Sequence, residues 1–129
     1  MSAQKASNSS KEQIANFIPT IIDSIQDIKG KKIIKLDLTN LDERPTDYFI
    51  ICQGESSTQV KSIAQNIQLR LKDELGLSPQ RSEGIAGAKW ILVDYFDVIV
   101  HVFYPETREF YDLEDLWSDS EITTYKDLD

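Results

Sequence analysis

The chain has 129 residues and a formal net charge of −8, with 22 acidic residues against 14 Lys and Arg residues. This length is enough for one domain with a hydrophobic core, and no apolar run approaches the length of a membrane-spanning helix. The basic residues are scattered, which argues against a nucleic-acid-binding patch, whereas the acidic excess suits solubility or a basic protein partner.

The N-terminal segment predicts a tail followed by a helix. Residues 1–10 (MSAQKASNSS) lack the apolar core of a secretory signal, and we expect a flexible tail there. Gly30 is expected to end the helix that follows, and Pro19 to kink it or to mark a late start. The helix is predicted from an apolar stripe at helical spacing, formed by Ile14, Phe17, Ile18, Ile21, Ile25 and Ile28.

Two strands are predicted after this helix. In residues 31–39 (KKIIKLDLT) apolar side chains alternate with polar ones, which is typical of a half-buried strand. Residues 47–54 (DYFIICQG) are apolar on both faces, which indicates a central strand. This second strand contains the single cysteine, Cys52, so no internal disulfide can form. A small buried side chain in a reducing cytoplasm is its expected role.

The clearest helix covers residues 54–76 (GESSTQVKSIAQNIQLRLKDELG). Ser56 and Gln59 fit a capping box, and Gly76 fits the position just after the last turn. The apolar stripe of this helix is formed by Val60, Ile63, Ala64, Ile67, Leu71 and Leu75. A strand that leads into a helix implies a crossover to a parallel strand, and residues 79–84 (PQRSEG) are the predicted parallel strand.

The last third of the chain predicts a hairpin and a short helix. Residues 88–95 (AKWILVDY) and 97–104 (DVIVHVFY) are two strong strands with only a tight turn between them. Residues 111–117 (YDLEDLW) follow as a short amphipathic helix, and residues 118–129 as an acidic C-terminal tail. The predicted fold class is therefore α/β (α+β), with a mixed β-sheet of about five strands and helices packed on it.

Candidate catalytic groups are few. His101 is the single histidine and shares a strand face with Ile99 and Phe103, where a packed, hydrogen-bonded role is more common than catalysis. Asp94 and Asp97 could coordinate a metal ion, but they lie on either side of the hairpin turn, where turn chemistry is the simpler explanation. No catalytic residue, cofactor site or metal site is therefore predicted.

Aromatic side chains crowd the last third of the chain. Core packing explains several of them. Trp90 shares a strand face with Leu92 and Asp94, and an apolar face edged by carboxylates also suits a protein interface. The pattern alone leaves both functions, core and interface, open.

Two long segments resemble the Iojap/RsfS ribosomal silencing factors. They are DYFIICQGESSTQVKSIAQNI (47–67) and KWILVDYFDVIVHVFYPETREFYDLEDLW (89–117). The resemblance covers about residues 10–117, so we expect a silencing-factor domain over 11–117 between the two tails. The chain departs from the family pattern at Phe96, where glycine is frequent, and at Pro19.

The resemblance implies a fold similar to nucleotidyltransferases without their catalytic carboxylate set, and a cytoplasmic, non-enzymatic activity. Proteins of this family bind the large ribosomal subunit through its protein fourteen and sterically block joining of the small subunit, which represses translation. The acidic charge would then steer the encounter with a basic ribosomal protein. The positions that match the family signature, and are therefore candidate partner-binding residues, are Trp90, Asp94, Tyr95, Asp97, His101, Arg108, Glu109 and Tyr111.

Neither sequence-specific nucleic acid binding nor membrane association is implied, and a homodimer of the free protein stays open. Two other functions also stay open. One is a nucleotidyltransferase-like enzyme that uses Asp94 and Asp97 with Mg²⁺, which would show metal-dependent nucleotide binding in calorimetry. The other is an adaptor unrelated to ribosomes, which would not co-sediment with isolated large subunits.

Overall fold

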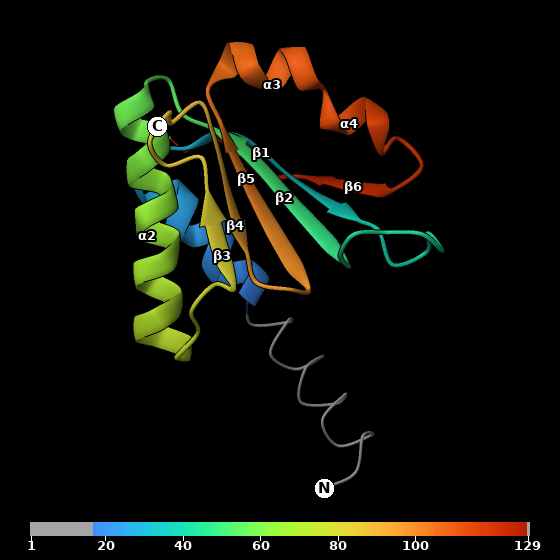
Figure 1. Cartoon of the computed structure of the whole chain (residues 1–129), viewed down its shortest axis with the longest axis horizontal. Coiled ribbons are helices and arrows are strands. Elements are labelled where there is room, and N and C mark those ends of the chain that lie inside the picture. The colour runs from blue at the N-terminus through green and yellow to red at the C-terminus, as the bar shows by residue number, and fades with distance from the viewer. Residues whose placement is uncertain (1–16, 129) are drawn as a thin grey trace, which may run out of the picture.

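The structure is a computed structural model that describes residues 17–128. Its centre is a six-stranded mixed sheet with the spatial order β3-β4-β5-β2-β1-β6 (Figure 1). The strands are β1 (Lys31–Asp37), β2 (Tyr48–Gln53), β3 (Arg81–Glu83), β4 (Trp90–Asp94), β5 (Val98–Phe103) and β6 (Glu121–Thr124). The helices within these residues are the helical residues 17–27, α2 (Ser57–Leu75), α3 (Pro105–Tyr111) and α4 (Leu113–Leu116). The predicted mixed sheet with packed helices is confirmed, with one strand more than expected.

Helices lie on both faces of the sheet. Residues 17–27 and α2 pack on one face, and α3 and α4 arch over the other (Figure 1). The helical residues 17–27 and α2 enclose the larger apolar core together with β2, β4 and β5. The second core is formed by Ile34, Leu36, Leu38, Phe49, Ile51, Ile99, Phe103 and Leu113. β5 and β2 lie in the middle of the strand order and contribute to both cores, which confirms the central strand predicted for residues 47–54.

The parallel pair of the sheet differs from the predicted one. β2 pairs in parallel with β5, with Ile51 opposite His101. The prediction that residues 79–84 form the parallel partner of β2 is therefore wrong. Those residues contain β3, which lies at the edge and pairs antiparallel with β4. Burial explains why β5, and not β3, pairs with the central strand β2. β5 is buried along its whole length, whereas β3 is short and largely exposed.

The C-terminal segment is part of the fold. We expected residues 118–129 to be an acidic tail, but β6 pairs antiparallel with β1. Beyond β6, the Tyr125 N–H donates to the Ile33 carbonyl, and the Lys32 N–H donates to the Asp127 carboxylate. The tail prediction is wrong here because a short, exposed edge strand carries no periodic apolar signal.

The ends of α2 follow the predicted capping signals. Ser56 accepts a hydrogen bond from the Gln59 N–H at 3.1 Å, and Gly76 takes a left-handed φ of 67° after the last turn of α2. Gly30 follows the first helix as predicted. The left-handed residue there is Lys29, with a φ of 62°.

Pro19 lies within the helical residues 17–27. Whether Pro19 marks a late start or a kink stays a prediction, because it depends on where the helix begins. The start of this helix and the tail predicted over residues 1–10 lie outside the described residues.

None of the helices in the described part of the chain has both the length and the apolar character needed to cross a bilayer.

Candidate protein-binding site

The β4–β5 hairpin carries the predicted residues on the faces that strand alternation assigned to them. The face toward α3 and α4 carries Trp90, Leu92, Asp94, Ile99, His101 and Phe103. His101 and Phe103 are buried, whereas Trp90 and Leu92 are only half-buried. The reason is visible in Figure 1, where α3 and α4 run from the end of β5 toward β6 and away from β4. The β4 side of this face is therefore open to a partner.

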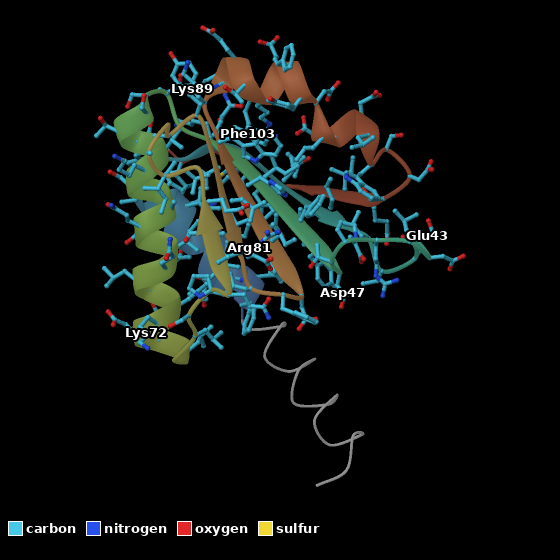
Figure 2. The ribbon with its side chains drawn as sticks, in the orientation of Figure 1. Glu43, Asp47, Lys72, Arg81, Lys89 and Phe103 are labelled. Atoms are coloured by element: carbon cyan, nitrogen blue, oxygen red, sulfur yellow. The ribbon has the colours of Figure 1, made fainter. Side chains whose placement is uncertain are left out.

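An aromatic cleft opens where the start of β4 meets α3. The cleft has a volume of about 420 Å³ and is lined by Lys89, Trp90, Glu106, Thr107, Phe110 and Tyr111. The Trp90 ring packs against Tyr111 at 4.7 Å and against Phe103 at 4.9 Å between centroids. Phe110 is 81% exposed and Tyr111 is 50% exposed, which makes the cleft the candidate protein-binding surface. In Figure 2, Lys89 and Phe103 mark this end of the sheet.

The main chain of Trp90 is held from two sides. Gly84 has a φ of 85°, and a Cβ there would collide with the Trp90 carbonyl. On the other side, the Tyr104 N–H donates to the Lys89 carbonyl at 2.8 Å, which extends the hairpin pairing up to the cleft. At the cleft, the start of β4 is therefore closely packed against Gly84 and hydrogen-bonded to the end of β5.

The indole of Trp90 is hydrogen-bonded to His101. Trp90 Nε1 donates to His101 Nδ1 at 3.0 Å, diagonally across the hairpin. His101 is 4% exposed, and burial lowers its pKa to about 4, so the ring is neutral near pH 7. Because Nδ1 accepts this bond, the proton of the neutral ring lies on Nε2, which has no hydrogen-bond partner. The predicted packed and hydrogen-bonded role of His101 is confirmed.

Arg108 ties α3 to the sheet from inside the protein. Its side chain is buried, and Nη1 donates to the Lys32 carbonyl at 2.7 Å and to Gln53 Oε1 at 3.2 Å. Its Nε donates to the Glu114 carboxylate at 3.3 Å. The planar guanidinium thus links α3 to β1, β2 and α4, and sets the direction in which α3 presents Phe110. The structure places Arg108 in a supporting role and argues against the direct partner contact that we predicted.

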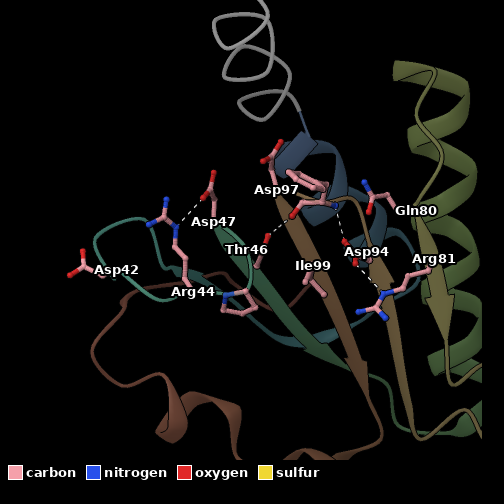
Figure 3. A pocket seen from close by; sticks show the side chains of 11 residues that line it. Asp42, Arg44, Thr46, Asp47, Gln80, Arg81, Asp94, Asp97 and Ile99 are labelled. Carbon is pink, nitrogen blue, oxygen red and sulfur yellow. Dashed lines mark hydrogen bonds and ion pairs between the residues drawn. The ribbon is translucent and has the colours of Figure 1, made fainter. Parts of the chain in front are cut away.

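Asp94 and Asp97 lie at the opposite end of the hairpin, beside a second hollow (Figure 3). Asp94 Oδ1 accepts the Phe96 N–H at 2.8 Å, which supports the left-handed φ of 77° at Phe96, and Asp94 Oδ2 pairs with Arg81 at 3.2 Å. The predicted turn chemistry is therefore confirmed for Asp94. Burial and the charge of Asp47 raise the pKa of Asp97.

These contacts do not favour a metal-dependent enzyme at the turn. Both oxygens of Asp94 are already used, one by the turn and one by Arg81. Paired-metal catalysis needs several carboxylates that converge on the ions. Within residues 17–128, no group of three or more His, Cys, Asp and Glu side chains is arranged to hold a metal ion.

The candidate partner-binding residues do not form one surface. Trp90 and Tyr111 line the aromatic cleft, whereas His101 is buried behind Trp90, so the structure argues against a direct partner contact of His101. Glu109 is exposed on α3 next to Phe110. Tyr95 is buried on the other face of the hairpin, edge-on to Phe17 at 6.3 Å, so the structure argues against a partner contact there. Asp94 and Asp97 lie apart from the cleft, at the turn.

Four residues that line the cleft were not among the candidate partner-binding residues: Lys89, Glu106, Thr107 and Phe110. Three of them lie on α3, which was not recognised as a helix. Pro105, at the start of α3, was the available signal, since proline is favoured in the first turn of a helix.

Comparison with known proteins gives one consistent result. The family model described as "Ribosomal silencing factor during starvation" matches residues 9–129, so the match extends past residue 117, where we expected it to end. A ribosomal silencing factor from Chromobacterium violaceum is 46% identical over 108 residues, 81% of this chain and 84% of the relative. One from Bacillus subtilis is 41% identical over 103 residues, with coverages of 80% and 83%.

A crystal structure of a protein from Chromobacterium violaceum has a TM-score of 0.77 to this chain at 40% sequence identity. The match covers 81% of this chain and 86% of that protein. Sequence and structure therefore agree with the motifs of the hairpin and α3: the chain belongs to the ribosomal silencing factor family.

Proposed function

We propose that this protein binds the large ribosomal subunit at its protein fourteen and blocks joining of the small subunit, so that it represses translation without catalysing a reaction. The proposed place of this activity is the cytoplasm. The observation that carries the proposal is the aromatic cleft, where Phe110 and Tyr111 are exposed beside the half-buried Trp90. Family membership supports the ribosome as the partner.

The chemistry of the cleft suits a basic protein partner. Large aromatic rings are the side chains that most often anchor protein interfaces, because they bury much apolar area for few rotatable bonds. Glu106 is exposed and lines the cleft beside these rings, where its carboxylate can pair with a Lys or Arg of the partner. Glu109 is exposed on α3 as well, but it lines a different hollow. The net charge of −8 adds long-range attraction toward the same kind of partner.

We expect the protein to co-sediment with isolated large ribosomal subunits and not with small subunits. The reason is that the proposed contact lies on a protein of the large subunit. Sucrose-gradient sedimentation of the protein with each subunit measures this directly. When the protein is added before the two subunits are mixed, it should also lower the fraction of joined ribosomes. Equal binding to both subunits, or to neither, would contradict the proposed function.

Charge neutralisation at the cleft should slow association. Glu106→Gln removes a carboxylate that lines the cleft, so association with the purified ribosomal protein should be slower at low salt. The difference from wild type should shrink as salt rises, because the field is screened over about 8 Å at physiological ionic strength. Asp97→Asn should have a smaller effect, since Asp97 lies at the far end of the hairpin. Stopped-flow association across a salt series measures these rates.

The matched control for these charge variants is Asp73→Asn. Asp73 is exposed on α2, which packs on the other face of the sheet, and the substitution changes the net charge by the same amount. If all three variants slow association equally, the acidic residues act only through net charge. If none of them changes the rate at any salt concentration, the acidity serves solubility.

A further inference from the structure

The polar atom of Trp90 is used inside the protein. The indole N–H of Trp90 donates to Nδ1 of His101, a side chain that is almost entirely buried. An indole that must keep its N–H aimed at a fixed acceptor loses its freedom to turn about both side-chain torsions. The Trp90 ring is therefore held in one orientation at the edge of the aromatic cleft.

The acceptor is itself immobile. His101 lies on β5, which is buried along its length. Its ring stands edge-on to Phe49 at 4.6 Å and stacks with Phe103 at 6.2 Å between centroids. Because the His101 ring is packed against these neighbours on a central strand, it cannot change its orientation to suit the indole. The position of Nδ1 therefore fixes the indole rather than the reverse.

Apolar packing alone does not explain a histidine at position 101. Its Nε2 is buried with no hydrogen-bond partner, and burying an unpaired polar group destabilises a fold. The neighbours of His101 on this face of the sheet are aromatic or aliphatic, among them Phe49, Leu92 and Phe103. An aliphatic side chain would pack there without that penalty. What the histidine adds is an acceptor for Trp90.

We infer that His101 is a positioning residue for partner binding, which holds the indole of Trp90 so that its ring, and not its N–H, meets the ribosomal partner. The inference rests on the proposed function, since it takes the aromatic cleft as the contact surface. A ring held in its bound orientation loses less entropy on binding. It also restricts the chemistry of the partner group, because a ring face accepts aliphatic or cationic groups.

Two substitutions of the same residue separate positioning from packing. His101→Leu introduces an apolar side chain and removes the acceptor, whereas His101→Asn introduces an amide oxygen near the place of Nδ1 that can accept the same hydrogen bond. We expect His101→Leu to weaken binding to isolated large ribosomal subunits by about tenfold, since the indole must then be ordered during binding. Its melting temperature should be unchanged or higher than that of wild type. His101→Asn should recover most of the affinity even if it melts lower.

The indole N–H of Trp90 gives a readout that packing alone would not change. The chain has two tryptophans, so Trp117→Phe assigns the two indole resonances in a ¹H–¹⁵N spectrum. The Trp90 indole proton should exchange slowly with water in wild type and in His101→Asn, and quickly in His101→Leu. A merely structural role of His101 predicts that affinity follows melting temperature in both variants.

The outcomes distinguish the inference from the function on which it rests. If wild type fails to sediment with large subunits, the proposed function fails and the inference falls with it. If wild type binds and Trp90→Ala does not, but His101→Leu binds as tightly as wild type, only the inference is overturned. Loss of affinity in His101→Leu, recovery in His101→Asn and the expected exchange rates together support it.

Discussion

Replacement of Trp90 by alanine is expected to weaken binding to the large ribosomal subunit by about 2 kcal/mol or more, which is roughly a thirtyfold loss of affinity. The substitution removes the ring that packs on Tyr111 and Phe103 and lines the aromatic cleft. Because Trp90 is only half-buried, the free energy of unfolding should fall by less than the roughly 3–5 kcal/mol that removal of a fully buried aromatic ring costs. Sedimentation binding and a thermal melt on the same sample measure both quantities.

The second tryptophan provides the matched control. Trp117 is also half-buried and packs edge-on to Phe49 at 6.0 Å on the same face of the sheet, but it does not line the cleft. Trp117→Ala should therefore lower the melting temperature and leave the affinity near that of wild type. If both alanine variants lose affinity equally at a temperature where both are folded, Trp90 has no special place in the interface and the proposed contact surface is wrong.

The faces of the β4–β5 hairpin could be predicted from the sequence because alternation along a strand is a local property. Ile99, His101 and Phe103 share one face, and Trp90 shares a face with Leu92, as the pattern indicated. The helix that became α2 was equally clear, since its apolar stripe and both caps agree. The sequence could not choose between core and interface for Trp90, and the structure shows why, because the residue is half-buried.

Non-local features could not be read from the sequence. The parallel pairing of β2 with β5 depends on which strand buries most area at the centre of the sheet, and three segments lie between them in the chain. β6 is a short exposed strand with no apolar pattern of its own. It is a strand because it pairs with β1. Both errors concern where a segment docks, and local patterns do not contain that information.

The missed helix α3 has a different cause, and it bears on function. In α3 the buried residue is Arg108, whereas Phe110 is 81% exposed. This reverses the usual pattern of an amphipathic helix, in which apolar residues face inward and charged residues face water. A search for apolar periodicity therefore fails on α3. The inversion arises because α3 is anchored by the internal hydrogen bonds of Arg108 and leaves the ring of Phe110 exposed.

Acidification is expected to destabilise the fold through His101. Burial lowers the pKa of His101 to about 4 in the folded protein, from 6.5 for an exposed histidine. Above about pH 6.5 the ring is neutral in both the folded and the unfolded state, so it adds no pH dependence. Between about pH 6.5 and 4 the unfolded chain binds the proton more readily, and the free energy of unfolding should fall by about 3 kcal/mol in total.

Comparison of wild type with His101→Leu isolates this contribution. Asp97 acts in the opposite sense, because burial and the charge of Asp47 raise its pKa, so that its protonation favours the folded state as pH falls. Both proteins contain Asp97 and the other carboxyl groups, and those contributions cancel in the difference. Denaturant unfolding at several pH values should show wild type losing about 3 kcal/mol relative to His101→Leu between pH 7 and pH 4. A difference that stays constant across this range would mean that His101 titrates normally and is not buried as the structure shows.

Protonation also occupies Nδ1, the acceptor of the Trp90 indole N–H, so the Trp90 indole resonance should move over the same pH range in which stability is lost.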